Sequence, residues 1–381
     1  MSATHEDLRR GVREVCASFP NEYWRGLDAA GRYPEEFVGA LSEAGYLAAL
    51  VPEEYGGMGL DLSAACVILE EVNRSGANAG PAHAQMYTMG TLLRHGSEEQ
   101  RREYLPKIAS GELRLQAFAV TEREAGTDTT SIRTTARREG DHYVVNGSKI
   151  YTSRVMQSDL MVLLTRTTPL EDAEKRSKGL SVFLVDLRET EGLTVEPRRV
   201  MMNNATNELF FENVRVPAES LIGEEGEGFR YILDGMNAER ILISAECIGD
   251  GRFFIERAVE RAKEREVFGR PIGKNQGIQF PIARAYAGVE AASLMVGTAA
   301  SLFDSGKPCG AEANLAKLLA ADASWEAANV AVQTFGGYGF DREYDIERKF
   351  RETRLYQVAP ISTNLILSHV AEHVLGLPRS F

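Results

Sequence analysis

The order in which two apolar patterns follow each other constrains the fold of this chain more than any other feature. Apolar residues recur at helical spacing from Glu6 to about Leu115, alternate in short segments from about Gln116 to Pro217, and return to helical spacing from Gly228. Because strands and helices do not alternate, the chain cannot build a doubly wound sheet, which argues against a nicotinamide Rossmann domain. The pattern predicts an α+β protein with three domains, namely 1–115 (helical), 116–227 (strands) and 228–381 (helical).

Within these regions the periodicity predicts individual elements. The alternating segments predict strands at 118–120, 142–145, 161–165, 180–185 and 208–211. The long periodic segments predict C-terminal helices at about 230–265, 276–303, 311–335 and 361–375. The pair Asn146-Gly147, flanked by Tyr143-Val144-Val145 and Ile150-Tyr151, is typical of a type I′ turn and predicts a hairpin there.

Composition narrows the classes of function. A net charge of -12 and a pI near 5.2 argue against nucleic acid or an anionic membrane as a partner. The four cysteines lack metal-ligand spacing, and His369 and His373 lack the flanking pattern of a zinc helix, so we expect no metal. The polar start MSATHEDLRR and the lack of any run of about 18 apolar residues lead us to expect a cytoplasmic protein that does not span a membrane.

The segment Phe118–Asp128 has the sequence FAVTEREAGTD. Its backbone N–H groups and the hydroxyls of Thr121 and Thr127 are donors of the kind that surround a flavin ring or a pyrophosphate. The segment resembles the flavin-binding signature of the acyl-CoA dehydrogenase family, in which an aromatic strand leads into Thr-Glu-x-x-Ala-Gly-Ser/Thr-Asp. The resemblance implies that FAD contacts lie at Phe118, Val120, Thr121, Gly126 and Thr127, and that Thr127 also meets the substrate.

Three further segments extend the resemblance. Asn146–Ser153 is similar to the family's second flavin strand, where Tyr151 holds the position of an aromatic ring over the flavin and Ser153 that of a hydroxyl near its N5 atom. Two later segments, Arg265–Gly269 with the following Asn275-Gln276, and Gln333–Phe340, are similar to those that bind the adenosine half of FAD across a subunit interface, with glycines for close approach and an arginine for phosphate. The resemblance implies FAD contacts at Arg265, Phe268, Gln276, Gln333, Gly336, Gly337, Ser362 and Asn364.

The family resemblance runs in order from about Leu47 to the C-terminus. It implies a helical N-terminal domain, a β-barrel-like middle domain and a C-terminal four-helix bundle. It also implies FAD as cofactor, an acyl-CoA thioester as substrate, an electron-transfer flavoprotein as acceptor, and a homo-oligomer, expected to be a tetramer.

The catalytic base departs from the commonest pattern of the family. Many members place a carboxylate just after a Tyr-Gln pair, but here Tyr356-Gln357 runs into Ala359-Pro360, and no carboxylate is available. Isovaleryl and long-chain types place the base on the helix that opens the third domain, and Glu239 occupies that position. The resemblance implies Glu239 as base, Arg240 as its catalytic neighbour, and substrate contacts at Asn237, Arg240, Ala359 and Pro360.

Proline at 360 also removes a backbone donor. The family uses the N–H at that position to hold the thioester carbonyl, and proline has none. Either the N–H of Ile361 takes over, or the chemistry is slower or different. We therefore expect an FAD-dependent acyl-CoA dehydrogenase, in which Glu239 removes a proton and the hydride passes to flavin N5. Two alternatives stay open: a flavin- or CoA-binding subunit with little activity in a hetero-oligomer, and an oxygen-using flavoprotein on the same fold.

Overall fold

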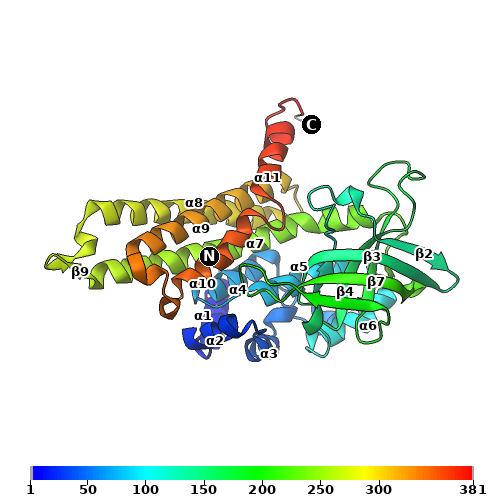
Figure 1. Ribbon diagram of the computed structural model, residues 1–381, viewed down its shortest axis with the longest axis horizontal. Helices are drawn as coiled ribbons and strands as arrows, with labels where there is room; N and C mark the ends of the chain where they lie inside the picture. Colours follow the sequence, from blue (N-terminus) through cyan, green and yellow to red (C-terminus); the bar gives the residue numbers. More distant parts are fainter. Residues whose placement is uncertain (1–2, 380–381) are drawn as a thin grey trace. The chain divides into compact units, whose positions relative to one another are not determined.

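The computed structural model describes residues 3–379 (Figure 1). These residues form two compact units. Unit 1 comprises the described parts of Met1–Ala30, Asp61–Ala79 and Asn237–Phe381, and unit 2 comprises Gly31–Leu60 and Gly80–Met236. Unit 1 therefore draws on both the first and the last helical regions of the sequence, while the boundaries of the three domains stay a prediction.

Unit 1 is helical. Its helices are α1 (Ala3–Ala17), α2 (Asn21–Ala30), α4 (Leu62–Arg74), most of α7 (Gly228–Glu264), α8 (Gln276–Asp304), α9 (Gly310–Phe335), α10 (Ile346–Thr353) and α11 (Thr363–His369), and α11 continues as one π-helical turn, Val370–Val374. A small hairpin, β9 (Glu266–Val267) and β10 (Arg270–Pro271), lies between α7 and α8. The four C-terminal helices expected from the periodicity are confirmed.

The long helices of unit 1 pack through small and branched apolar side chains. On α8 the buried residues recur every three or four positions, as Ile282, Ala285 and Val289 do. Helix α9, beside α8 in Figure 1, buries mainly alanine, which lets its neighbours approach closely. At Gly251 of α7, an added Cβ would lie 2.7 Å from Val289, so glycine is required where α7 meets α8.

Several charged side chains are buried between the helices of unit 1. The ammonium group of Lys349 lies 2.7 Å from Asp250 Oδ1 and 2.9 Å from Glu352 Oε2, and it donates to the carbonyl of Ala77. Arg348 also pairs with Glu352, at 3.0 Å. Buried charges are tolerated only when they are paired in this way, so these contacts fix how α10 lies against α7.

Unit 2 holds the sheet. Its strands are β1 (Leu115–Ala119), β2 (Thr135–Glu139), β3 (His142–Ser153), β4 (Leu160–Arg166), β5 (Leu180–Asp186), β6 (Leu193–Pro197), β7 (Thr206–Pro217) and β8 (Leu221–Ile222). They run in the order β6-β7-β3-β2-β4-β5-β8, and β1 pairs with β4 in parallel. Each of the five expected strands is present, and β2, β6 and β8 are additional. Helices α3 (Glu35–Glu43), α5 (Gly80–His95) and α6 (Glu98–Ala109) complete the unit.

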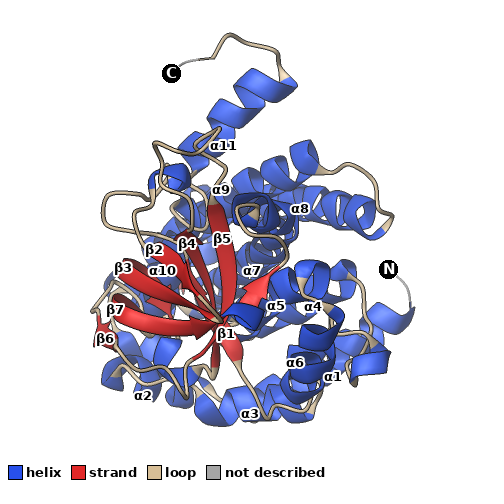
Figure 2. Cartoon of the chain, turned by 90° about the vertical axis from the view of Figure 1, so that its right-hand side faces the viewer, coloured by secondary structure: helices blue, strands red, loops and turns tan. Residues whose placement is uncertain are grey.

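The sheet, drawn in red in Figure 2, buries separate apolar clusters on its two faces. Alternate residues of β4 point to opposite faces, so Leu160 and Val162 pack with residues of α5 and α6, whereas Met161 and Leu163 face the other way. The second cluster joins residues of β4 and β5 with residues of β3 and β7, such as Tyr143 and Phe211. Strands at both ends of the sheet thus share one interior, as in a barrel-like sheet.

The expected hairpin at Asn146-Gly147 is wrong, because β3 runs straight through both residues. The irregularity is a bulge, at which the pairing of β3 with β7 shifts between Val145 and Gly147. Asn146 does not turn the chain but bonds across to β7: its Oδ1 accepts from the N–H of Asn213, at 2.8 Å. Glycine is required at 147 because an added Cβ would lie 2.6 Å from the Cα of Thr134, and φ is +141°.

Gly147→Ala is expected to destabilise the protein by roughly 1–3 kcal/mol, since the new methyl group meets backbone that cannot move aside. Gly26→Ala, at a helical position with no atom within 4 Å of the new Cβ, should leave stability equal or slightly higher. Urea unfolding of both variants checks this. Equal stability of Gly147→Ala and wild type would show that the strand can shift away from Thr134.

Candidate functional site

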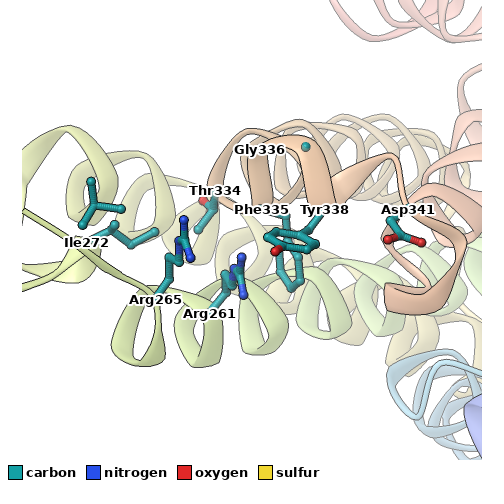
Figure 3. Close-up of a pocket in the computed structure, with 10 residues that line it drawn as sticks. Arg261, Arg265, Ile272, Thr334, Phe335, Gly336, Tyr338 and Asp341 are labelled. Atoms are coloured by element: carbon teal, nitrogen blue, oxygen red, sulfur yellow. The ribbon is translucent and has the colours of Figure 1, made fainter.

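A pocket of about 520 Å³ opens in unit 1 where α7 ends and α9 ends (Figure 3). Arg261 and Arg265 stand one turn apart at the end of α7, which places both guanidinium groups on the same face of the helix. The pocket is lined by Arg261, Arg265, Val267, Ile272, Thr334, Phe335, Gly336, Gly337, Tyr338 and Asp341.

The chemistry of this pocket combines cations with aromatic rings. The Arg261 guanidinium lies 4.5 Å from the ring centre of Tyr338 and 5.6 Å from that of Phe335. Its Nε atom is buried and has no hydrogen-bond partner within the described part of the chain. An unpaired buried donor of this kind is costly unless a ligand accepts from it. At Gly336 and Gly337 an added Cβ would meet no atom within 4 Å, so the backbone there is open to a ligand.

The pocket gathers only part of the set expected from the sequence. Arg265, Gly336 and Gly337 line it, whereas Phe268, Gln276 and Gln333 do not. Phe268 is fully exposed and has a left-handed φ of +52°. Sequence reasoning missed Arg261, Phe335, Tyr338 and the other lining residues, although two arginines four positions apart at a helix end are a signal that could have pointed to Arg261.

If this pocket binds the phosphates of FAD, as the resemblance implies for Arg265, replacing both Arg261 and Arg265 by Ala is expected to weaken FAD binding strongly. Hydrogen bonds from charged groups contribute about 1.5–3 kcal/mol each, so each arginine is worth roughly a tenfold to hundredfold change in affinity. The flavin-to-protein absorbance ratio and the Kd of reconstitution measure this. Lys263→Ala, an exposed residue between the two, is the matched control and should bind normally. Wild-type affinity in the double variant would contradict a phosphate-binding role.

In unit 2 the fold brings together two strands expected to hold the flavin. The N–H of Ile150 donates to the carbonyl of Thr121, at 2.9 Å, which places the end of the first motif beside the second. Phe118 is half-buried and contacts Tyr87 edge to face. Tyr151 is 61% exposed and has a left-handed φ of +58°, a strained arrangement for an aromatic residue and one often found at functional sites.

The remaining residues expected here lie around these strands. Val120 and Ser153 are half-buried, and the hydroxyl of Ser153 accepts from Asn204 Nδ2, at 2.9 Å. Gly126 and Thr127 are exposed in the loop that follows. All of these residues belong to one unit, so the structure gathers the first two motifs on one region of the sheet.

A buried ion pair, missed by sequence reasoning, holds this region in place. Lys149, fully buried, donates to Glu122 Oε1 at 2.8 Å and to the carbonyl of Val120 at 3.0 Å. Burial lowers the pKa of Lys149 to about 8, and the Glu122 carboxylate acts against that shift. Glu122 in turn accepts from the N–H groups of Arg133 and Thr134. The two motifs are therefore tied together beneath the surface that carries Tyr151.

The expected catalytic pair lies on α7 in unit 1. Glu239 is only 5% exposed, and Arg240 is partly buried beside it. Arg240 donates to Asn237 Oδ1, at 3.1 Å, while its Nε is buried without a hydrogen-bond partner among residues 3–379. Burial lowers the pKa of Arg240, and the Glu239 carboxylate acts against that shift. A carboxylate and a guanidinium withdrawn from water, with donor capacity unused, suit a polar ligand.

The segment after α10 carries the other residues expected to meet ligand. Tyr356 is buried, whereas Ala359 is half-buried and Pro360 exposed. Ser362 caps α11 by accepting from the N–H of Leu365, at 3.3 Å, and Asn364 is exposed in the first turn of that helix. The sequence contains no Asp or Glu from Arg354 to Ala371, so this segment supplies no carboxylate.

Neither a metal site nor a clear membrane segment emerges. No group of three or more His, Cys, Asp and Glu side chains within residues 3–379 is arranged to hold a metal ion. One described helix, α8, is long and apolar enough to cross a membrane by length and composition alone. Because Glu290 of this helix is ion-paired and the helix packs along α9, its length and composition alone are weak evidence for a membrane span.

Taken separately, the two units carry residues of the kind that bind different parts of a flavin dinucleotide. Two arginines, aromatic rings and open glycine backbone suit phosphates and an adenine ring, while the paired strands of unit 2 suit the flavin end. Strands between two helical regions, together with these two groups of residues, are what we expect of a flavin-dependent oxidoreductase.

Comparison with known proteins identifies the family. The chain matches the acyl-CoA dehydrogenase N-terminal domain over residues 2–112, the middle domain over 117–214 and the C-terminal domain over 226–375. The chain belongs to the acyl-CoA dehydrogenase family, and FAD is its cofactor.

Individual relatives cover the whole chain. Acyl-CoA dehydrogenase fadE12 of Mycobacterium bovis is 34% identical over 385 residues, which span 100% of this chain and 98% of that protein. The structure of glutaryl-coenzyme A dehydrogenase in complex with glutaryl-CoA matches with a TM-score of 0.93 and 31% identity, covering 100% of this chain and 97% of that one. The prolyl acyl carrier protein oxidase AnaB matches with a TM-score of 0.91 and 25% identity, covering 99% and 100%. The expected α+β fold of the family is confirmed.

Proposed function

We propose that this protein catalyses α,β-dehydrogenation of an acyl-CoA thioester, with Glu239 as the base that removes the α-proton. The observation that carries this proposal is the burial of Glu239 on α7 together with the lack of any carboxylate from Arg354 to Ala371. A carboxylate withdrawn from water is the kind of group that enzymes use for proton abstraction next to a carbonyl. FAD, when bound, accepts the hydride that leaves the β-carbon.

Arg240 and Asn237 orient the base and the ligand. Asn237 accepts one hydrogen bond from Arg240 and so restrains its guanidinium group, which also interacts electrostatically with Glu239. The buried Nε of Arg240 still has a proton to donate. Arg240 thus offers a charged donor at the place where negative charge develops as the α-proton leaves.

The thioester carbonyl needs a donor that proline cannot supply. The N–H of Ile361, the residue after Pro360, donates to no acceptor in the described part of the chain. We assign to it the role of holding the thioester oxygen, with Ala359 and Pro360 shaping the surface next to the acyl group. Loss of a single such donor costs about 2.7–4 kcal/mol in other enzymes, so a free N–H here supports the dehydrogenase proposal over an inactive subunit.

The exposed apolar side chains of α8 support an oligomer. Phe280, Tyr286 and Leu294 of α8 are exposed apolar side chains in the single chain. An exposed apolar face of this kind is typical of a protein interface, and we propose that further copies of this chain bind to it in a homotetramer.

The four cysteines are free and buried, as in a reducing compartment, which supports the cytoplasm as location. An electron-transfer flavoprotein is the proposed acceptor.

Anaerobic titration of the purified flavoprotein with a panel of acyl-CoA thioesters tests the reaction. Bleaching of the flavin absorption band by at least one saturated acyl-CoA is the expected result. Failure of every thioester to bleach a flavin that dithionite does reduce would favour the binding-subunit alternative. Light scattering on the same sample gives the number of chains.

An oxygen-using flavoprotein is the second candidate, because the oxidase AnaB shares this fold at 25% identity. The name of AnaB includes an acyl carrier protein, so the panel of thioesters should include one acyl group on a carrier protein. Admission of oxygen to the reduced protein separates the two candidates. A dehydrogenase is expected to reoxidise slowly with oxygen and rapidly with an electron-transfer flavoprotein, and an oxidase the reverse.

A further inference from the structure

Lys317 is a fully buried lysine on α9 whose ammonium group donates hydrogen bonds to two backbone carbonyls of one short segment. It donates to the carbonyl of Tyr356, at 2.5 Å, and to the carbonyl of Ile361, at 2.8 Å. These two carbonyls bracket the segment that contains Ala359 and Pro360. Burying an ammonium group is expensive, and a core position between helices would more commonly hold leucine or methionine. The two bonds therefore indicate a role in fixing this segment.

The same segment is held at its start by a second contact. The hydroxyl of Tyr356 accepts from Asn73 Nδ2 at 2.9 Å and donates to Glu246 Oε2 at 3.1 Å. Glu246 lies two turns after Glu239 on α7, so both carboxylates belong to one face of that helix. Tyr356 thus joins the loop to the helix that carries the proposed base, while Lys317 joins it to α9.

Lys317 is also an electrostatic neighbour of the proposed base. Burial lowers the pKa of Lys317, and the Cys247 thiol, Asp322 and Glu239 act against that shift. The attraction between Lys317 and Glu239 is mutual, so a charged Lys317 favours the ionised carboxylate. The charged and titratable groups around this pair are Arg240, Glu246, Cys247 and Asp250 of α7, Asp322 of α9, Tyr356, and His369 of α11, which interacts with Arg240.

We propose that Lys317 is a positioning residue for the reaction: it holds Tyr356–Ile361 so that the Ile361 N–H can meet the thioester carbonyl, and its positive charge attracts the Glu239 carboxylate. This inference rests on the proposed dehydrogenation. It assigns to one buried lysine two effects, on the geometry of the carbonyl donor and on the charge of the base, and assigns it no direct contact with substrate or cofactor.

Three substitutions separate the two roles. Lys317→Met removes donor and charge, Lys317→Gln keeps a donor but no charge, and Lys317→Arg keeps both. With FAD content and KM near those of wild type, Lys317→Met is expected to lose roughly a hundredfold in kcat, because a small displacement of a reacting group costs about that much. Lys317→Gln should recover part of this loss. Glu326→Gln, an exposed residue on the same helix, is the control and should have wild-type kcat.

The pH profile is the measurement that a merely structural role would not change. Activity needs the ionised carboxylate, so loss of the cation should move the acid limb of kcat/KM up by roughly one pH unit in Lys317→Met and Lys317→Gln. Lys317→Arg should leave the limb in place. If Lys317→Met does not fold, the comparison of Lys317→Gln with Lys317→Arg still tests whether the charge at position 317 shifts the acid limb.

Two results would overturn the inference. One is a flavin-loaded Lys317→Met or Lys317→Gln whose acid limb matches that of wild type. The other is turnover within about threefold of wild type in Lys317→Met. Failure of the proposed function itself is seen separately, because wild-type protein would then not be bleached by any acyl-CoA.

Discussion

Glu239→Gln is expected to slow reduction of the flavin by an acyl-CoA about 10²- to 10⁴-fold, the usual contribution of a general base. Glutamine preserves the shape of the side chain but cannot accept the α-proton. FAD content should not change, since Glu239 lies on α7 well before Arg261 and Arg265, which line the pocket at the end of that helix. Stopped-flow absorbance at the flavin band measures the rate.

Glu256→Gln is the matched control for this substitution. Glu256 lies on the same helix but is half-exposed and pairs at the surface with Arg74, at 2.6 Å. Its loss should leave flavin reduction at the wild-type rate. A Glu239→Gln protein that bleached as fast as Glu256→Gln would place the base elsewhere in the chain.

Lys349→Met is expected to lower the free energy of unfolding by about 3–5 kcal/mol, because it leaves buried carboxylates without their cation. Asp250 and Glu352, both buried, face the ammonium group directly. Removal of Arg10, whose pair with Asp7 is exposed on both sides, should cost no more than about 1 kcal/mol. Urea unfolding of Lys349→Met and Arg10→Met makes the comparison.

The pKa of Asp250 determines how the loss of stability in Lys349→Met should change with pH. Burial raises the pKa of Asp250 to about 7, against the effect of Lys349. The folded state therefore binds this proton more tightly than the unfolded state does, and the stability it contributes is lost as pH rises through 7. Without Lys349, no cation in this cluster stabilises the ionised form of Asp250 directly, so the buried carboxyl group favours its protonated form more strongly. The loss in Lys349→Met should be larger at pH 8 than at pH 5, and an equal loss at both would show that Asp250 is not the group left unpaired.

The sequence predicted those features that local patterns determine. Helices α7, α8 and α9 follow from apolar spacing alone, and the strands around Phe118 and Val162 follow from alternation. The hairpin predicted at Asn146-Gly147 was wrong because a local turn signal competed with a tertiary contact: Gly147 is required by the backbone of Thr134, just before the neighbouring strand β2, and not by a turn. Pattern reasoning has no access to such cross-strand contacts.

The site was only partly predictable for the same reason. Motifs identified Arg265 and Gly336. Arg261 was missed because its place in the pocket depends on the contact of its guanidinium group with Tyr338, a residue far away in the sequence. The buried lysines were missed altogether. In sequence Lys149 and Lys317 look like surface residues, since lysine is rarely buried, and their acceptors lie 27 to 44 residues away.

Exchange of the substrate's α-proton with solvent tests the central claim most directly, because it isolates the step assigned to Glu239. The probe is an acyl-CoA analogue with sulfur in place of the β-methylene, which can lose an α-proton but has no β-hydride to give. Incubated in D2O with the FAD-loaded protein and followed by NMR, its α-protons should exchange with wild type and with Glu256→Gln, and not measurably with Glu239→Gln. Exchange by Glu239→Gln at the wild-type rate would contradict the account.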